Sequence, residues 1–260
     1  MSAAYLVCAS QRSGSTLLVE SLAATGVAGK PEEFFQYFAS SSLSPQPREW
    51  FAGVSDPSLL DLLDPTDPGT VDTRTTDEWR ADLLRKGATP NGVWGGKLMW
   101  NQTPLLLART RSATGSVRTA IRSLFDGADP LYVHVHRPDL VGQAVSMWVA
   151  VQTRVWRGDA GEAYHRARYR ADGIAHLAGV LRAQDQAWRD WFAAENITPL
   201  EVDFPTLTKE PTKATARVLE ALGQDPDLAP PPPLHRQSDG RSAEWAARYR
   251  VDAAENGYPL

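Results

Sequence analysis

Residues 5–22, YLVCASQRSGSTLLVESL, carry the clearest structural signal in the chain. The apolar run at 5–9 is typical of a buried strand, and an apolar segment of helical type begins at Leu17. A strand, a loop of small residues and a helix make a cradle for phosphate-like anions, because backbone amides approach the oxyanion at the positive end of the helix dipole. The stretch therefore predicts an anion site on the loop, formed by Arg12, Ser13, Gly14, Ser15 and Thr16.

This loop differs from the Walker loop of kinases and ATPases. Alignment of G-x-x-x-x-G-K-[ST] on Gly14 puts Ala9 in the place of the first glycine and Ser15 in the place of the lysine. A triphosphate site also holds Mg²⁺, whereas a phosphosulfate carries less charge around the transferred group and can be held by arginine, lysine and amides alone. An ordinary strand-to-helix turn capped by a serine is the alternative interpretation.

Three further segments, 93–99, 131–136 and 200–204, are rich in β-branched and aromatic residues and predict buried strands. Helical patterns separate them, the clearest at 161–196, so the fold class is α/β with a mostly parallel sheet and helices on both faces. We expect a single domain over residues 1–260. Within it, a proline-rich spacer at 230–233 leads to a C-terminal segment, 234–260.

Bulk properties exclude several functions. The net charge of −4 lacks the broad positive potential of general nucleic-acid binders, so an anion site must be local. The chain shows neither a signal peptide nor a run of about 18 apolar residues, so we expect a cytoplasmic protein without a membrane span.

The single cysteine, Cys8, lies in an apolar segment, so we expect a buried thiol. His134 and His136 have no further ligand cluster nearby in the sequence, and we predict no metal site.

A second anion signal follows the 131–136 strand. Arg137 lies at the carboxyl end of that strand, where open α/β sheets bind ligands. Ser146 lies about two turns into the helical pattern that follows, with its hydroxyl on the side of the strand. Together they predict a clamp for a second phosphate, such as a 3′-phosphate. The alternative is that Arg137 forms an ion pair with Asp139 or caps a loop.

At this point the residues resemble a family. The loop QRSGSTLL at 11–18, HRPD at 136–139 and Ser146 are similar to the two donor-binding motifs of sulfotransferases that use 3′-phosphoadenosine-5′-phosphosulfate (PAPS). Blocks along most of the chain resemble the bacterial members that sulfate trehalose, among them PEEFFQ at 31–36 and NGVWGGKLMWNQ at 91–102. The resemblance implies a P-loop-like sulfotransferase fold, PAPS as donor without a metal, the 2-hydroxyl of trehalose as acceptor, and a homodimer.

The resemblance also implies roles for residues at the acceptor. In this family the acidic residue of the PEEFFQ block is proposed as general base, which is Glu33 here, and a surface carboxylate is the alternative. The animal enzymes have a Lys-x-His where this chain has Lys97-Leu-Met, so a carboxylate must replace the histidine, and we expect Lys97 at the acceptor. Trp100 and Trp156 are candidates for stacking on the sugar, with core packing as the alternative.

A C-terminal loop that folds over the nucleotide is a further implication of the resemblance, with Arg236, Arg241 and Trp245 as candidate contacts. The predicted reaction is an in-line displacement at sulfur, in which Glu33 takes the hydroxyl proton while Arg12 and the loop amides stabilise the leaving phosphate. Two other functions stay open: a small-molecule kinase that binds Mg-ATP, and a nucleotide- or carbohydrate-binding protein without catalysis. The missing Walker lysine argues against the kinase.

Overall fold

The computed structural model describes residues 3–36, 46–65, 72–111, 115–157, 161–231 and 240–260. The chain divides into two compact units. The first comprises Met1–Tyr37, Asp72–Pro138 and Gln184–Arg236, and the second comprises Phe38–Val71, Asp139–Ala183 and Gln237–Leu260. The single domain with a nucleotide-covering C-terminal segment stays a prediction, and residues 232 and 233 of its proline spacer lie outside the described residues.

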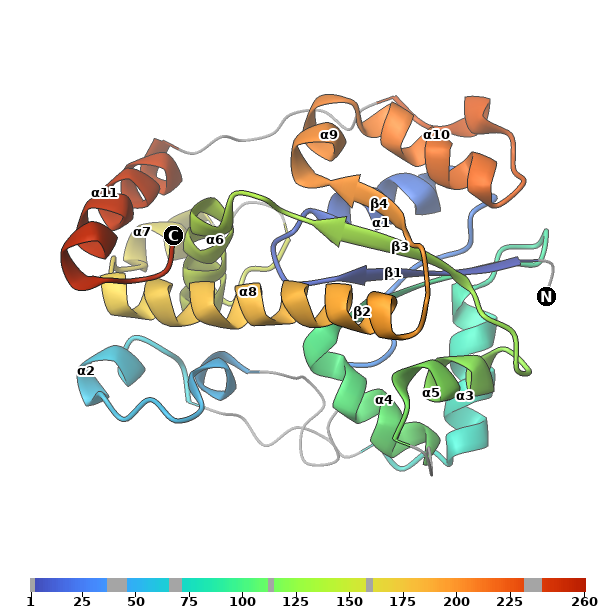
Figure 1. The fold of residues 1–260 in the computed structure, drawn as a ribbon, viewed down its shortest axis with the longest axis horizontal. Coiled ribbons are helices and arrows are strands. Elements are labelled where there is room, and N and C mark those ends of the chain that lie inside the picture. The colour runs from blue at the N-terminus through green and yellow to red at the C-terminus, as the bar shows by residue number, and fades with distance from the viewer. Residues whose placement is uncertain (1–2, 37–45, 66–71, 112–114, 158–160, 232–239) are drawn as a thin grey trace. The chain divides into compact units, whose positions relative to one another are not determined.

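The first unit is built on a parallel sheet of four strands in the order β2-β1-β3-β4 (Figure 1). The strands are β1 (Ala3–Ala9), β2 (Val93–Met99), β3 (Leu131–His136) and β4 (Leu200–Asp203). All four lie on segments that the sequence predicts to be strands, and the α/β fold class is confirmed. The last strand ends one residue before the predicted limit, because Asp203 accepts a hydrogen bond from the Thr206 amide and caps a helix that begins at Phe204.

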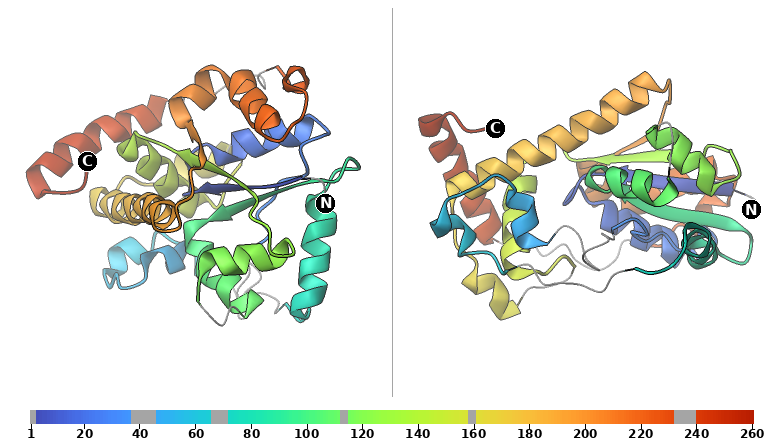
Figure 2. Two further views of the ribbon diagram at one scale, coloured as in Figure 1. Left: turned by 45° about the vertical axis from the view of Figure 1, so that its right-hand side comes forward. Right: turned by 90° about the horizontal axis from the view of Figure 1, so that it is seen from below.

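Helices cover both faces of this sheet. Alternate residues of β1 point to opposite faces and therefore pack against different helices. Tyr5, Val7 and Ala9 pack with α1 (Ser15–Ala24), α9 (Phe204–Lys209) and α10 (Pro211–Ala221). Leu6 and Cys8 pack on the other face, with α3 (Thr76–Gly87), α4 (Thr103–Thr110), α5 (Val117–Leu124) and the part of α8 (Ala171–Ala194) after residue 183. Both layers are visible in Figures 1 and 2. Cys8 is fully buried, as predicted, and burial raises the pKa of its thiol.

The carboxyl ends of the strands meet at one edge of the sheet. Ala9 pairs with Met99 on one side and with Val135 on the other, and His136 pairs with Asp203. The segments that follow these strands are therefore brought together by the topology. They are the loop 10–14, the short helix η2 (Trp100–Gln102), Arg137 and α9.

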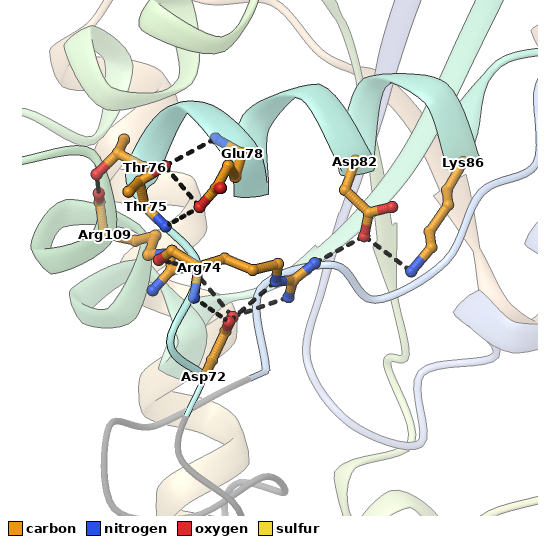
Figure 3. A network of polar contacts seen from close by, with 8 residues as sticks. All are labelled: Asp72, Arg74, Thr75, Thr76, Glu78, Asp82, Lys86 and Arg109. Carbon is orange, nitrogen blue, oxygen red and sulfur yellow. Dashed lines mark hydrogen bonds and ion pairs between the residues drawn. The ribbon is translucent and has the colours of Figure 1, made fainter.

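An ionic network fixes α3 against α4 in the same unit (Figure 3). A capping box of Thr75 and Glu78 begins α3. Arg74 donates hydrogen bonds to Asp72 and, at 2.7 Å, to Asp82. Arg109 of α4 reaches the same Asp72 carboxylate at 3.1 Å. Asp72 thus accepts from both arginines, and the hydrogen bond with Arg74 is the main cause that lowers its pKa to about 2.

The second unit is helical. It contains η1 (Pro47–Phe51), α2 (Pro57–Leu60), α6 (Leu140–Thr153), α7 (Gly161–Arg166), the first part of α8, and α11 (Gly240–Asn256). Its core surrounds the fully buried Trp148 of α6. The prediction of one helix over 161–196 is wrong, because residues 167–170 separate α7 from α8. The Arg168 carbonyl accepts from Trp148 and Gln152 side chains and its amide donates to Gln152, so its backbone groups are engaged outside any helix.

Candidate active site

The loop between β1 and α1 has the geometry of an anion cradle. Gly14 is the N-cap of α1 with φ of 94°, and no side chain caps this helix, so the predicted alternative of a serine cap is wrong. A Cβ at Gly14 would lie 2.7 Å from Cδ2 of Phe204, so only glycine fits. Arg12 also has a positive φ, of 61°. These two left-handed residues turn the loop, and they leave the first amides of α1 uncapped by any described side chain.

Ser13 supplies a polar atom that points to a ligand. The residue is fully buried, and within the described part of the chain its Oγ has no hydrogen-bond partner. Buried hydroxyls in folded proteins are nearly always bonded, and an anion held by a loop of this type can accept a hydrogen bond from this one. The residues present thus fit a phosphate-bearing ligand at the predicted place.

Two guanidinium groups converge next to this loop. The pKa of Arg12 is lowered, first by burial and then by the positive charge of Arg137. Arg137 in turn lies over the ring of Phe204, 4.2 Å from its centroid. Phe204 therefore contacts both anion signals of the sequence, since its ring also packs against Gly14. The structure brings Arg12 and Arg137 together, and together they favour a ligand with more than one negative charge.

Ser146 lies in the second unit, on α6, and is half-buried. Asp139 caps the same helix by accepting from the Gly142 amide at 3.0 Å, and it also pairs with Arg250 at 3.4 Å. The clamp of Arg137 and Ser146 on a 3′-phosphate stays a prediction.

Glu33 is held by two donors rather than lying free on the surface. The backbone of Glu32 bridges to β2, where its carbonyl accepts from the Lys97 amide at 2.9 Å. Lys97 Nζ lies 2.7 Å from Glu33 Oε1, and Gln102 Nε2 donates to Oε2 at 3.0 Å. The Lys97 side chain is 1% exposed and that of Glu33 is 23% exposed. A buried ammonium needs such a partner, and the carboxylate keeps a side open to solvent.

Lys97 also joins this carboxylate to the phosphate loop. Its ammonium donates to Thr16 Oγ1 at 3.3 Å, so one buried cation contacts Glu33 and the first turn of α1. Lys97 lies far along the sequence from both Glu33 and Thr16, and the parallel pairing of β1 with β2 brings the three residues to one edge. A carboxylate with an open side beside an anion cradle can accept a proton from a molecule that lies next to the anion.

The tryptophans proposed to stack on a sugar are in different units. Trp100 is half-buried in η2, and its ring packs edge-on against Trp188, with centroids 4.9 Å apart. Trp188 donates from Nε1 to the carbonyl of Ala9, the last residue before the loop, at 3.0 Å. Trp156 belongs to the second unit and is 37% exposed. For Trp100 the alternative of core packing therefore applies at least in part, and the stacking roles stay predictions.

Of the three C-terminal candidates, Arg236 lies outside the described residues. Trp245 is 6% exposed in the core of the second unit. Arg241 lies over the Trp245 ring at 4.6 Å and donates to the carbonyls of Tyr164 and Ala167. These contacts fasten α11 to the α7 segment, and a contact with the nucleotide stays a prediction for all three.

Two residues of this edge escape prediction from the sequence. Gln102 is the last residue of the 91–102 block that resembles the sulfotransferases. No sequence spacing marks it as a partner of Glu33. The apolar pattern places Phe204 at the end of a strand, and only the cap at Asp203 puts its ring over the loop. The signal that could have found it is Asp203-Phe-Pro-Thr read as a helix start, because aspartate is favoured as N-cap and proline is tolerated in the first turn.

Among the described residues, no group of three or more His, Cys, Asp and Glu side chains is arranged to hold a metal. His134 and His136 point the same way from β3, as predicted, with ring centroids 5.4 Å apart. His134 Nδ1 lies 2.9 Å from Glu201 Oε2, and Nε2 lies 3.4 Å from Asp185 Oδ1.

A separate question is membrane insertion. None of the helices in the described ranges combines the length and the apolar character that a membrane span requires.

The α/β fold and this sheet edge, with its anion cradle, paired arginines and lysine-bound carboxylate, suit an enzyme of the group-transfer class. Residues 4–252 match the family described as Stf0 sulphotransferase, and the chain belongs to this family. The predictions of a sulfotransferase and of an enzyme are thereby confirmed.

The chain is similar to two trehalose 2-sulfotransferases. It is 58% identical to that of Mycolicibacterium smegmatis over 263 residues, which cover 99% of this chain and 98% of the relative. It is 56% identical to that of Mycobacterium tuberculosis over 261 residues, which cover 98% and 97%. A crystal structure of a sulfotransferase from Alicyclobacillus acidocaldarius covers 98% of this chain and 96% of its own at 14% identity and a TM-score of 0.46.

Proposed function

We propose that this chain transfers the sulfuryl group of PAPS to the 2-hydroxyl of trehalose, giving trehalose 2-sulfate and adenosine 3′,5′-bisphosphate. The acceptor is supported by two relatives that carry this name at 58% and 56% identity over nearly the whole chain. The observation that carries the proposal is the chain of contacts from Glu33 through Lys97 to Thr16, which joins a proton acceptor to an anion cradle.

The residues present fit PAPS as the donor. The loop amides, Ser13 and Arg12 would hold the phosphosulfate end, and Arg137, with Ser146, would hold the 3′-phosphate. When bound, PAPS supplies the sulfuryl group and the leaving phosphate. The close approach at Gly14, the buried Ser13 hydroxyl without a partner among the described residues, and the two converging arginines support this assignment.

The protein's own part in the reaction is to place groups and to move one proton. Glu33 accepts the proton of the acceptor hydroxyl as that oxygen attacks sulfur in line with the leaving phosphate. Lys97 holds the Glu33 carboxylate and adds positive charge at the first turn of α1, where the anionic end of the donor would bind. Arg12 and the loop amides stabilise the negative charge that grows on the leaving phosphate. The charges around the donor come from side chains and amides, and we propose a reaction that needs no metal.

A Glu33→Gln variant tests the base. The amide cannot take the proton, so we expect kcat with PAPS and trehalose to fall by about 10²–10⁴-fold. The Kd for adenosine 3′,5′-bisphosphate, measured by calorimetry, stays within about threefold of wild type, because the nucleotide contacts are intact. Glu32→Gln is the matched control, since Glu32 is exposed next to it and should keep its activity. A Glu33→Gln enzyme at the wild-type rate would refute the assignment.

One mass-spectrometric assay separates the proposed reaction from its rivals. Purified protein is incubated with PAPS and a panel of sugars in EDTA, and the products are searched for a gain of one sulfuryl group. We expect the gain on trehalose. In a parallel incubation with Mg-ATP in place of PAPS and without EDTA, phosphorylation of a sugar would support a kinase. Nucleotide binding without product in either incubation would support a non-catalytic protein. We also propose a homodimer in the cytoplasm, and sedimentation at micromolar concentration tests the dimer.

A further inference from the structure

Gln102 is a buried side chain that contacts the proposed base. It lies in η2, directly after β2, and is 1% exposed. Its Oε1 accepts a hydrogen bond from the Met99 amide at 3.1 Å, and its Nε2 donates to Glu33 Oε2 at 3.0 Å. One amide group thus links the end of a central strand to the carboxylate.

The backbone fixes which way this amide faces. The Met99 amide can only donate, so it requires the oxygen of Gln102 on its side. The NH₂ group must then face Glu33. Rotation of the amide by 180° would put two donors together at Met99 and two acceptors together at Glu33, and both contacts would be lost. The orientation of Gln102 is therefore set by the strand and not by the ligand.

Both oxygens of Glu33 are held in this way from one short segment, 97–102. Lys97 Nζ binds Oε1 and Gln102 Nε2 binds Oε2, and both partners are buried. Neither partner offers an acceptor to Glu33, so the carboxylate meets each of them with a lone pair. A partial rotation about the last Glu33 torsion would break both contacts, and the 23% of the side chain that stays exposed leaves the carboxylate accessible to an acceptor.

We infer that Gln102 is a positioning residue, which fixes the Glu33 carboxylate in the orientation that receives the acceptor proton. The inference rests on the proposed function of Glu33. Gln102 itself touches neither donor nor acceptor in this scheme, and it acts through its hydrogen bond to Glu33. A purely structural role would depend on the bond to Met99 alone, and the two roles can be separated by substitution.

The experiment compares three variants in the full-length protein. Gln102→Glu keeps an acceptor for the Met99 amide but replaces the donor to Glu33 with a second carboxylate. Gln102→Leu has a similar size and removes both bonds. Thr103→Val is the control, because Thr103 is buried in the same turn and its hydroxyl bonds only the Trp100 carbonyl among the contacts found there. The kcat, the KM values and the pH profile of kcat are measured for each.

We expect both Gln102 variants to lose about 10- to 100-fold in kcat, the effect of losing one hydrogen bond to a charged group. The KM for PAPS stays near wild type. The acidic limb of the pH profile moves to higher pH, further in Gln102→Glu, because a second negative charge opposes ionisation of the base. Thr103→Val keeps kcat within about threefold and leaves the limb in place.

A Gln102→Glu enzyme with the wild-type kcat and pH profile would overturn the inference, as would an equal shift in Thr103→Val. A measurement that needs no turnover tests the role of Gln102 separately from the proposed function. The ¹³C signal of the Glu33 carboxyl, assigned by its loss in Glu33→Gln, should titrate at higher pH in Gln102→Glu than in wild type. If the wild type does not sulfate trehalose, the proposed function fails, while the titration still decides the role of Gln102.

Discussion

Lys97 shows at the level of one residue how the sheet and the site depend on each other. A charged side chain in the middle of a strand whose residues are all buried is rare, because an ammonium loses its hydration there. Glu33 and Thr16 provide the acceptors that replace water. The same pair of contacts ties the segment after α1 and the first turn of α1 to β2. Lys97, whose charge makes burial costly, thus connects Glu33 with the phosphate loop.

Gly14 gives a prediction about sterics. Gly14→Ala should lower the free energy of unfolding by about 1–3 kcal/mol and weaken adenosine 3′,5′-bisphosphate binding, since its Cβ meets Phe204 and its φ of 94° disfavours a side chain. Gly26→Ala is the matched control, because Gly26 has φ of 71° and nothing lies within 4 Å of the place that its new methyl group would take. Urea unfolding of both variants isolates the steric part. Equal losses in the two would contradict the close packing of Phe204 on the loop.

Phe204 gives a prediction about the second anion signal. Phe204→Leu removes the ring under Arg137, and a cation–π contact of about 0.5–2 kcal/mol corresponds to about a 2- to 30-fold loss of affinity. We expect this loss for adenosine 3′,5′-bisphosphate. Adenosine 5′-monophosphate, which lacks the 3′-phosphate, should lose less affinity, because leucine still packs against Gly14 of the loop. Calorimetry with both nucleotides tests the pair, and an equal loss for both would remove Arg137 from the 3′-phosphate.

At the level of elements, the strands were predictable because each is an apolar run bounded by loop residues. Segments 93–99 and 131–136 match β2 and β3 at both ends. The break between α7 and α8 was not predictable, since it depends on the side chains of Trp148 and Gln152 from another helix. The turn from β1 into α1 and the place of Arg137 after β3 were predictable from local sequence. The contacts of Gln102 with Glu33 and of Phe204 with Gly14 were not, because they join segments far apart in the chain.

The network between α3 and α4 yields a prediction with a pH dependence. Asp72→Asn loses charge-assisted bonds to Arg74 and Arg109, and we expect the free energy of unfolding at pH 7 to fall by about 1–3 kcal/mol. The pKa of Asp72 is lowered to about 2, so its contribution is present above the unfolded value of about 3.9 and is lost as the pH falls toward 2.

Denaturant unfolding of wild type and Asp72→Asn at several pH values measures this difference. The gap between the two curves should shrink as the pH is lowered from about 4 toward 2. Asp77→Asn serves as control, since Asp77 is exposed in the first turn of the same helix and should change little. A gap that stays constant through this range would show that the Asp72 charge is not responsible.

At the scale of the whole first unit, His134 joins the last strands of the sheet to α8. Its ring is fully buried, with Glu201 of β4 and Asp185 of α8 on its two nitrogens, and His136 and Arg189 lie close by. Burial alone would lower its pKa, but the hydrogen bond with Glu201 and the ion-pair contact with Asp185 outweigh it, and the pKa of His134 is raised. The folded protein thus favours the imidazolium.

The global stability should therefore depend on this histidine below neutral pH. With a raised folded pKa, its contribution is fully present below the unfolded value of about 6.5 and is lost as the pH rises through the folded value. The difference in free energy of unfolding between wild type and His134→Gln should be largest near pH 6 and shrink on the alkaline side. His136→Gln is the control, because the pKa of His136 is lowered, chiefly by burial. A difference that grows with pH would contradict the stabilising contacts of a protonated His134 with Glu201 and Asp185.

The repulsion that Arg137 exerts on Arg12 also bears on how the protein is handled. Small oxyanions in a storage or assay buffer relieve that repulsion, so phosphate and sulfate salts act as weak stabilisers and, for the same reason, as competitors of the nucleotide. Thermal melts in phosphate will give too high a melting temperature for the ligand-free protein. Titrations in sulfate will give too low a nucleotide affinity. Chloride-based, amine-buffered solutions at fixed ionic strength give the undistorted comparison between variants.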